Sequence, residues 1–412
     1  MGRVAATGRS LPDDLDTSVR PSPPEARALV ARFGSPLYVY DLDEVERRYR
    51  SFLSAFAYRP LECHYAIVCN KNPLIVRRLY ELGAGIHANT PGDAFAALAA
   101  GIEPDRIVYS GTNLTRADLD FLLERRIPLN LDSLDQLRDV AAAARGGRIG
   151  LRVLIDDPTK RNRIGVDPSE LGEAVALARR AGVDVVGLHM YAGTNTRRAS
   201  RYLECLNRLI AASDAVADLE YIDIGGGFGV GYRDGEADLD LAVVGREISD
   251  RMLSLRRRRR RPVRLVVEPG RTLVATSGSL LVTVVSVKER GGRRFVGVDS
   301  TVGNIVVPSV YHGFHRIEML GRVGPDLDLP TDVCGNTTHS GDFLARDIRL
   351  PRVAPGDLLA LRDVGAYAYA MSSHFLNRPR PAEVVLDGAR PVLTTRRETF
   401  VDLVALHEPV PA

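Results

Sequence analysis

The chain has 412 residues, of which 45% are hydrophobic and 26% charged, and its formal net charge at pH 7 is +3. This length exceeds the usual size of one domain, so we expect two domains, with ample apolar material for a large core. The nearly balanced charge does not favour a nucleic-acid-binding protein, and no apolar run of about 18 residues predicts a membrane span.

Two features of the sequence predict a reducing environment. The N-terminus lacks the apolar core of a signal peptide. The cysteines, Cys63, Cys69, Cys205 and Cys334, show no CxxC pairing, so we expect free thiols and no metal site. We therefore predict a cytoplasmic protein.

The first part of the chain alternates between apolar strands and helical segments. Residues 1–24 are polar and without periodicity, which predicts a loose N-terminal arm, and residues 36–40 indicate a first short strand. Further strands are predicted at 62–69, 85–90, 106–110, 128–132, 148–155, 184–191, 221–224 and 264–268. Eight strands in regular alternation with helices over about 240 residues match the usual size of a (β/α)8 barrel.

The pattern changes after Arg271, where strands follow one another without long helices between them. The β-rich segments are 280–287, 294–298, 358–362 and 382–386. We therefore predict a barrel over residues 25–280 and a β-rich domain over residues 281–412. The strand at 36–40 is expected to join the β-rich domain.

A run of six arginines, Arg256 to Arg261, precedes the last barrel strand. Clustered arginines can bind the phosphates of nucleic acids. Because no aromatic residues are interleaved and the overall charge is near zero, we instead predict a solvated loop.

The strand at 221–224 is followed by three glycines, Gly225, Gly226 and Gly227. Consecutive glycines leave backbone N–H groups uncovered and can bind an anion such as phosphate, although a tight turn without a ligand would fit the run equally well. The next strand ends in Glu268-Pro-Gly-Arg271, which brings a carboxylate and a guanidinium to the neighbouring strand end. Two adjacent strand ends with phosphate donors indicate a site at the mouth of the barrel.

Further motifs accompany these two strand ends along the chain. They are Tyr65-Ala-Ile-Val-Cys-Asn70, Gly187-Leu-His-Met-Tyr-Ala-Gly-Thr194, Cys334-Gly-Asn-Thr-Thr-His-Ser-Gly-Asp342, Gly365-Ala-Tyr367, Met371-Ser-Ser373 and Arg378-Pro-Arg-Pro-Ala-Glu383. In these motifs the chain resembles the fold-type III pyridoxal-phosphate-dependent decarboxylases, the group that holds diaminopimelate and ornithine decarboxylases. The resemblance implies an α/β fold, with a TIM barrel of the alanine racemase type and a C-terminal all-β domain. It also implies a head-to-tail homodimer with shared active sites.

The resemblance further implies a binding site for pyridoxal 5'-phosphate. Glu268 would pair with the pyridine nitrogen and favour the protonated ring, which withdraws electrons from the substrate Cα; the plainer role for this carboxylate is a surface salt bridge. Tyr191 stands in place of a family histidine that stacks on the ring, and Thr194 replaces a serine near the phosphate. The phosphate would be held by Gly225, Gly226, Gly227, Gly270, Arg271 and Tyr367.

Val68 is the main departure from the family pattern, because it stands where the family has its Schiff-base lysine. Valine has no amine and cannot bond to the cofactor. Lys71 lies three residues further on, where we expect it at the rim, although a turn at Asn70 could bring its amine back. The other two lysines, Lys160 and Lys288, are not obvious substitutes.

Other family positions have changed as well. Thr338 replaces a cysteine that serves as an acid at the dimer interface, and threonine is a poor proton donor. The neighbouring His339 either takes over proton transfer, together with Asp342 in the same segment, or is a polar interface residue. Val307 replaces an arginine that binds a substrate carboxylate. His87 and Asp93 stand at two positions that are acidic in the family, in the second and third turns. His87 has lost the carboxylate, and Asp93 carries a shorter side chain.

These residues leave three functional hypotheses open. The first is an enzyme that binds pyridoxal or pyridoxamine 5'-phosphate without a covalent bond and acts on an amino-acid-like substrate, with His339 or Lys71 moving protons. The second is a non-catalytic homologue that binds a cofactor, a metabolite or a partner. The third is a cofactor-independent enzyme that uses the same phosphate site. Glu268 and Arg271 favour the first two, since Glu268 has no obvious role without a pyridinium.

Overall fold

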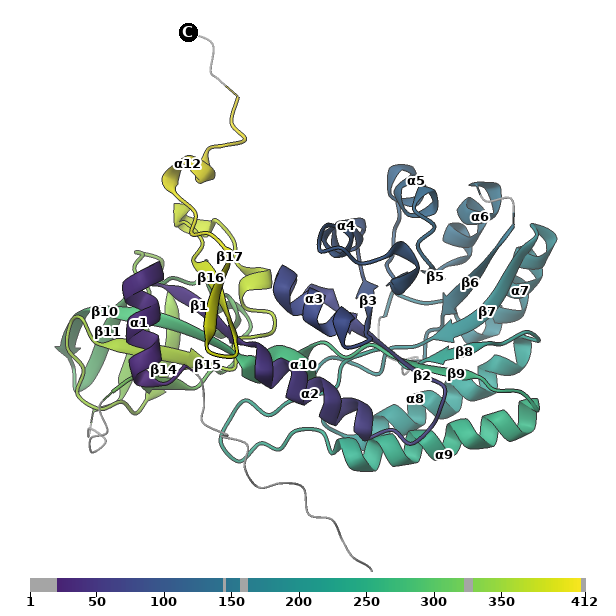
Figure 1. Ribbon diagram of the computed structural model, residues 1–412, viewed down its shortest axis with the longest axis horizontal. Coiled ribbons are helices and arrows are strands. Elements are labelled where there is room, and N and C mark those ends of the chain that lie inside the picture. Colours follow the sequence, from purple (N-terminus) through teal and green to yellow (C-terminus); the bar gives the residue numbers. More distant parts are fainter. Residues whose placement is uncertain (1–20, 144–145, 156–161, 322–328, 409–412) are drawn as a thin grey trace, which may run out of the picture.

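The computed structural model describes residues 21–143, 146–155, 162–321 and 329–408, which form two sheets at opposite ends of the molecule (Figure 1). One sheet has eight strands and is surrounded by helices. The other has nine strands and carries most of the C-terminal third of the chain.

The eight-stranded sheet is a closed parallel barrel. Its strands are β2 (Leu61–Ala66), β3 (Gly85–Ala88), β4 (Ile107–Tyr109), β5 (Asn130–Leu131), β6 (Gly147–Arg152), β7 (Val183–His189), β8 (Tyr221–Asp223) and β9 (Arg264–Val267). β9 pairs with β2, and a parallel bridge between Tyr109 and Leu129 joins β4 to the start of β5. The predicted (β/α)8 barrel is therefore confirmed.

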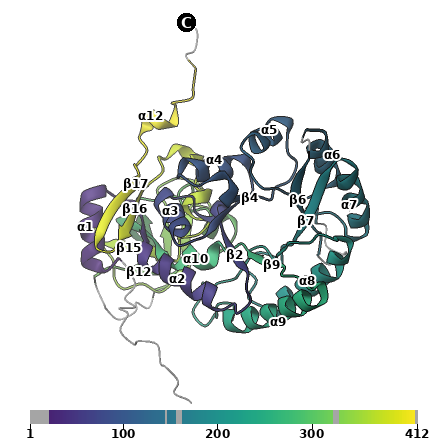
Figure 2. The same ribbon diagram turned by 45° about the vertical axis from the view of Figure 1, so that its right-hand side comes forward.

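Helices alternate with the barrel strands along the chain and cover their outer side (Figure 2). They are α2 (Leu42–Ser54), α3 (Pro73–Glu81), α4 (Pro91–Ala99), α5 (Arg116–Glu124), α6 (Leu134–Ala143), α7 (Leu171–Arg180), α8 (Ala199–Ala212) and α9 (Leu241–Arg259). Helix α2 illustrates how the sequence sets their bounds. The Asp41 carboxylate caps its first turn by accepting the Asp43 N–H at 3.1 Å. Its buried face consists of Leu42, Val45, Tyr49 and Phe52, at helical spacing.

The interior of the barrel is filled in part by the ring of Tyr221. A Cβ added at Gly187 or at Gly150 would overlap this side chain, so the two glycines make room for it. The Tyr221 hydroxyl donates to Asn130 Oδ1 at 2.6 Å, which links β8 to β5 across the interior of the barrel. The side chains of Tyr221 and Asn130 lie below the carboxyl ends of the strands and fill the barrel interior there.

The nine-stranded sheet forms the C-terminal β domain. Its strands are β1 (Leu37–Asp41), β10 (Gly278–Arg290), β11 (Arg293–Val298), β12 (Ile317–Met319), β13 (Thr331–Cys334), β14 (Phe343–Ile348), β15 (Leu358–Arg362), β16 (Ala382–Asp387) and β17 (Arg390–Thr395). β1 lies between β10 and β16, antiparallel to the first and parallel to the second. The strand that we expected at 36–40 is thus part of this sheet.

Helix α1 (Pro23–Phe33) packs on the same β sheet, because Ala26 and Leu29 share a buried cluster with Leu281 and Val384. The sequence pattern places residues from 25 onward with the barrel, whereas this packing joins them to the β domain. The helix also starts within the predicted arm of residues 1–24. Residues 1–20 of that arm lie outside the described part of the chain.

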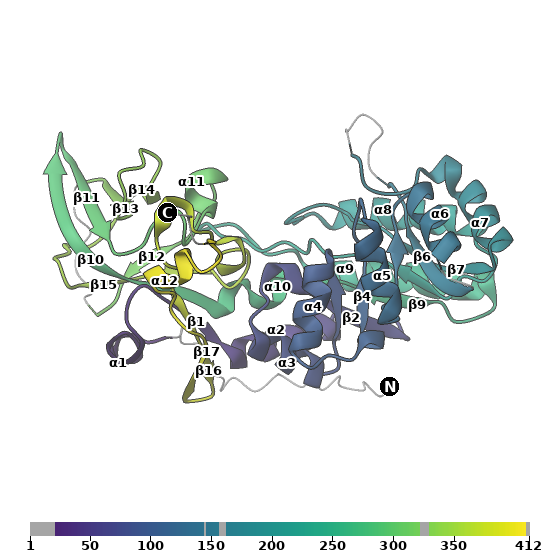
Figure 3. The ribbon, with the colours of Figure 1, turned by 90° about the horizontal axis from the view of Figure 1, so that it is seen from above.

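The barrel and the β domain meet where the chain passes from β9 into β10 (Figure 3), and where the loop after β15 packs against the segment that follows β2. Two hydrogen bonds fix this loop against the end of β2. Asn70 Nδ2 donates to the Gly365 carbonyl at 2.9 Å, and the Tyr367 N–H donates to the Cys69 carbonyl at 2.9 Å. The β domain therefore supplies one side chain, Tyr367, to the mouth of the barrel.

The arginine run is not the solvated loop that we predicted. Arg256 to Arg259 form the last turn of α9, and the side chain of Arg259 reaches carbonyl groups beyond the end of α8. Arg259 donates to the carbonyls of Val216, at 3.0 Å, and of Ser213, while Arg261 donates to the Ala217 carbonyl at 2.8 Å. Arg259 and Arg261 thus give charged donors to carbonyls in the segment that follows α8.

All four cysteines carry free thiols, and Cys63, Cys69 and Cys205 are buried. Within the described part of the chain, no helix combines the length and the apolar character needed to cross a membrane.

Candidate active site

A cavity of about 250 Å³ lies at the carboxyl ends of the barrel strands, where enzymes with this fold bind their substrates. Its walls come from the ends of β2, β3, β6, β7, β8 and β9 and from the loop after β15. The lining residues are Ala66, Val68, His87, Asn89, Arg152, Ile164, His189, Tyr191, Thr194, Asn195, Gly226, Gly227, Glu268, Gly270, Arg271 and Tyr367.

The glycine run after β8 forms one wall of the cavity. Gly226 and Gly227 line it, and no acceptor among the described residues binds their N–H groups. Gly227 has φ +84°, and a Cβ there would overlap the Gly193 carbonyl, so the position requires glycine. Gly225 differs from our expectation, because its N–H donates to Asp223 Oδ1 at 2.9 Å and it does not line the cavity. Two backbone donors of the three predicted ones therefore face the cavity.

Arg271 lies beside this wall as the first residue of α10 (Arg271–Val274). Its Nη1 donates to the Tyr232 hydroxyl at 2.7 Å, and its guanidinium carbon is 4.6 Å from the centre of the Tyr367 ring. Gly270, just before it, leaves the approach open, since a Cβ there would press against Cys69 and Ala66. A fixed positive charge next to free backbone N–H groups is suited to a phosphate group.

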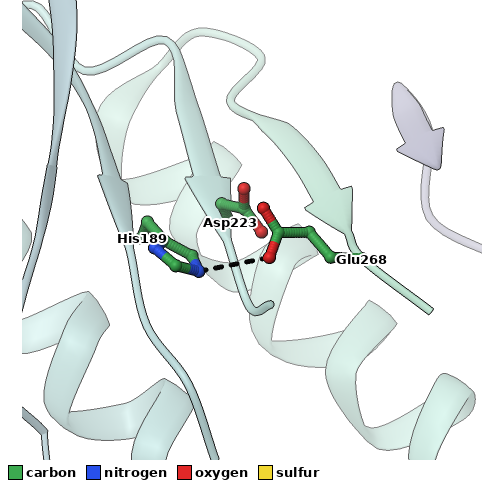
Figure 4. Close-up of side chains that lie close together, drawn as sticks. All are labelled: His189, Asp223 and Glu268. Atoms are coloured by element: carbon green, nitrogen blue, oxygen red, sulfur yellow. Dashed lines mark ion pairs between the residues drawn. The ribbon is translucent and has the colours of Figure 1, made fainter. Parts of the chain in front are cut away.

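Glu268 also lines the cavity, and its carboxylate lies close to His189 and Asp223 (Figure 4). His189 Nε2 is 3.3 Å from Glu268 Oε2, and His87 Nε2 is 3.4 Å from Glu268 Oε1. All four side chains are buried. The carboxylate is thus held between two imidazoles, with a second carboxyl group close by.

Burial decides the protonation of this cluster. It raises the pKa of Glu268 to about 7, and together with the charge of Glu268 it raises the pKa of Asp223 to about 8. Burial also lowers the pKa of His189 to about 4 and holds the pKa of His87 well below its ordinary value. At neutral pH both imidazoles are therefore uncharged and do not neutralise a carboxylate.

The cluster fits the protonated nitrogen of a pyridine ring. Glu268 Oε1 and His189 Nε2 have no hydrogen-bond partner among the described residues, and a buried carboxylate oxygen without one is costly. A cationic N–H donor in the cavity would satisfy it. The ligand-type atoms of His189, Asp223 and Glu268 also lie within 4.8 Å of one another, close enough to hold a metal ion, although the sequence predicted no metal site. The glycine wall and Arg271 favour a ring that carries a phosphate.

Tyr191 and Thr194 lie on the side of the cavity formed by the segment after β7. Both line it, and the Tyr191 hydroxyl is 2.9 Å from Thr194 Oγ1. The Arg152 guanidinium carbon is 5.7 Å from the centre of the Tyr191 ring. Tyr191 is also 36% exposed, so part of its aromatic ring is available for stacking on a planar ligand.

Val68 lines the cavity from the end of β2. The strand ends at Ala66 rather than at Cys69 as predicted, and Ile67–Cys69 form a 3-10 turn. The Tyr65 hydroxyl holds this turn by donating to the Asn70 carbonyl at 2.8 Å. An isopropyl group thus stands at the position that the sequence motif assigns to the reactive lysine.

Among the described residues, no lysine lines the cavity. Lys71 is exposed and interacts electrostatically with the carboxylates of Asp93 and Glu383. Lys288 belongs to β10 in the β domain. Lys160 lies outside the described residues.

The segment predicted to supply catalytic acids lies on the β domain and does not line the cavity of its own chain. Thr338 and His339 are exposed, and the His339 ring is 5.5 Å from the ring of Phe375. Asp342 is buried, and its carboxylate accepts the Val302 N–H at 2.7 Å, the Thr301 hydroxyl at 3.2 Å and two donors of Thr337. These contacts give Asp342 a structural role in holding neighbouring loops.

Several lining residues were not proposed from the sequence as parts of the site. Arg152, His189 and Asn89 occupy or follow the ends of barrel strands, and His87 was noted only as a departure from the family. The available signal was position, because side chains at the carboxyl ends of barrel strands point to the site.

Comparisons with known proteins agree with this geometry. The family model described as the pyridoxal binding domain of pyridoxal-dependent decarboxylases matches residues 42–275. The diaminopimelate decarboxylase of Methanothermobacter thermautotrophicus is 33% identical, covering 92% of this chain and 93% of the relative. That of Aquifex aeolicus is 31% identical, covering 91% of this chain and 92% of the relative.

A solved structure gives the same result. The diaminopimelate decarboxylase of Helicobacter pylori, crystallised in complex with L-lysine, superposes with a TM-score of 0.85 at 28% identity. The match covers 92% of this chain and 98% of the other.

Proposed function

Because this chain belongs to the family of pyridoxal-dependent decarboxylases, we propose that it is a divergent member that binds its cofactor without a covalent bond to a lysine. The family's cofactor is pyridoxal 5'-phosphate, and we include pyridoxamine 5'-phosphate, which needs no lysine bond. In this proposal the protein acts on a substrate derived from an amino acid. The observation that carries the proposal is Val68, which lines the cavity where the family motif has its lysine.

The cavity contains a group for each part of the cofactor. Gly226, Gly227 and Arg271 would hold the phosphate, and Glu268 would accept the ring N–H. Tyr191 would cover one face of the ring. When bound, the ring supplies an electron sink for the reacting carbon, a role that does not depend on the lysine.

The substrate class follows from the relatives and from one substitution. The Helicobacter pylori relative was crystallised with L-lysine, which supports an amino acid or a close derivative. Val307, at the start of the short helix α11 (Val307–Val310), replaces the arginine that would bind a distant carboxylate. We therefore propose a substrate other than diaminopimelate, without that second carboxylate.

We also propose a homodimer. Thr338 and His339 are exposed on the β domain and do not line the cavity of their own chain. Val310, Tyr311 and Phe375 are exposed in the adjoining segments, where Ser309 bonds to the Gly341 carbonyl and Phe375 contacts His339. An apolar surface around a polar loop is suited to cover the site of a second copy.

Reversible binding of the cofactor tests the proposal. Calorimetry and the absorbance spectrum with added pyridoxal 5'-phosphate should both show binding, and gel filtration should then remove the cofactor completely. Cofactor that stays on the denatured protein after borohydride reduction would show a covalent link and contradict the proposal. If millimolar cofactor does not bind at all, a cofactor-independent function becomes the better account.

A non-catalytic binding protein is the remaining alternative. It would bind the cofactor as proposed, yet leave a panel of L-amino acids and their amine derivatives unchanged. The same panel, followed by mass spectrometry of the products, separates this alternative from an enzyme.

A further inference from the structure

His87 lies near the end of β3, which pairs with β2, and Val68 lies in the 3-10 turn that follows β2. In the strand register it pairs with Ala66, two residues before Val68. Both His87 and Val68 line the cavity. The imidazole is therefore on the wall next to the place that a lysine at position 68 would occupy.

The imidazole of His87 is buried without a hydrogen-bond partner. Neither ring nitrogen has one among the described residues, although the side chain is only 6% exposed. Nε2 is the nitrogen near Glu268, at 3.4 Å from Oε1. Because a buried polar group normally finds a partner, a ligand in the cavity is the natural partner for the remaining nitrogen.

The surroundings keep this imidazole uncharged. The groups that act on it are His189, whose ring centre is 6.3 Å away, Arg152 and His64, together with Glu268. Burial is the largest effect and holds the pKa of His87 well below its ordinary value. A neutral imidazole has a lone pair and can act as a general base.

We propose that His87 is the residue that takes and returns the proton at the substrate carbon next to the amino group, since Val68 has no group that could do so. This inference rests on the proposed function. The Cα–H bond breaks, an N–H bond forms at His87 Nδ1, and the electron pair stays with the substrate. The imidazolium then lies beside the Glu268 carboxylate, which stabilises its charge, until the proton returns to the same carbon.

Other titratable groups are placed less well for this step. Lys71 is exposed and does not line the cavity. Cys69 is buried and does not line the cavity, and burial raises the pKa of its thiol to about 12. His339 lies on the β domain and does not line the cavity of its own chain.

The test is exchange of the Cα hydrogen for deuterium, followed by proton NMR. Full-length protein is loaded with pyridoxal 5'-phosphate and incubated in D₂O with a panel of the common L-amino acids, and the rate with the cofactor alone is subtracted. We expect exchange on at least one amino acid. His87→Gln should reduce its rate by about 100-fold or more, the usual contribution of a general base.

A second background distinguishes proton transfer from a structural role. In a Val68→Lys variant a lysine can move the proton, so His87→Gln should there change the rate by no more than about threefold. His407→Gln, at an exposed histidine that does not line the cavity, serves as the matched control and should leave the wild-type rate unchanged. An equal loss from His87→Gln in both backgrounds would overturn the inference.

A readout independent of turnover checks the contact itself. In protein labelled with ¹⁵N-histidine, the His87 ring signals, identified by their loss in His87→Gln, should shift on addition of phosphopyridoxyl-L-alanine, a stable mimic of the cofactor joined to an amino acid. Unshifted signals at saturation would contradict the inference. If the cofactor binds but the wild type exchanges no hydrogen, the inference fails and cofactor binding stands. If the cofactor does not bind, the proposed function fails as well.

Discussion

Arg271 lies beside the glycine wall, with its Nη1 2.7 Å from the Tyr232 hydroxyl and its guanidinium over the Tyr367 ring. Its charge would pair with the cofactor phosphate in a partly closed cavity. We expect Arg271→Ala to weaken cofactor binding by about 1.5–3 kcal/mol, which is roughly 10- to 150-fold in Kd. Calorimetry measures the change, and Arg180→Ala, an exposed arginine at the end of α7, should leave the Kd as it is.

Glu268 and Asp223 make the stability of the cofactor-free protein depend on pH. Burial raises their pKa values to about 7 and about 8 in the folded protein, whereas in the unfolded chain both lie near about 4. The stability that these groups contribute is therefore complete below about pH 4 and is lost as the pH rises through 7 and 8.

Urea denaturation of the cofactor-free protein at a series of pH values measures this effect. We expect the free energy of unfolding of Glu268→Gln to decline less than that of the wild type between about pH 5 and pH 8. Glu173→Gln, at an exposed position on α7, should follow the wild type. Parallel curves for Glu268→Gln and the wild type would contradict the pKa shift.

At the scale of single residues, the sequence predicted those groups that belong to motifs. Gly226, Gly227, Glu268 and Arg271 come together in the cavity because each follows a strand end with its own glycine signature. His87 and Arg152 could not be predicted in this way, since a lone polar residue at the end of an apolar strand has no local signature. The structural role of Asp342 could not be predicted either, because its hydrogen-bond partner Val302 is distant in sequence.

At the scale of elements, helix α9 owes part of its stability to the arginines of its last turn. Arg259 is partly buried and donates to the carbonyls of Val216 and Ser213. We expect Arg259→Ala to lower the free energy of unfolding by about 1–3 kcal/mol, because it leaves two carbonyls without a charged donor. Arg256→Ala, exposed in the same turn, should change it by less than about 0.5 kcal/mol. Equal effects of the two variants in urea denaturation would refute this role.

The elements themselves were largely readable from the sequence. Alternation of apolar strands with helical segments predicted all eight barrel strands, and the loss of that alternation after Arg271 predicted the β domain. The ends of elements were less certain. β2 stops at Ala66 because a 3-10 turn begins there, and this turn depends on a hydrogen bond from Tyr65 to Asn70. The arginine turn was missed because its partners lie beyond the end of another helix.

At the scale of the whole molecule, Thr338 and His339 are exposed on the β domain and do not line the cavity in the barrel of their own chain. We therefore expect a homodimer at micromolar concentration by light scattering. Phe375 is 53% exposed next to His339, and Phe375→Asp should weaken the dimer by placing a charge in an apolar interface. Leu253→Asp, on the outer face of α9, should not. A wild-type monomer would contradict the shared site.

The central claim is that the cofactor is held without a bond at position 68. The decisive measurement is borohydride reduction of the protein saturated with pyridoxal 5'-phosphate, followed by mass spectrometry of its peptides. The wild type should carry no cofactor adduct, whereas Val68→Lys should carry one on Lys at this position, because the rest of the site already holds the phosphate and the ring. An adduct on Lys71 or Lys160 of the wild type would contradict the claim and show that a displaced lysine has taken over the bond.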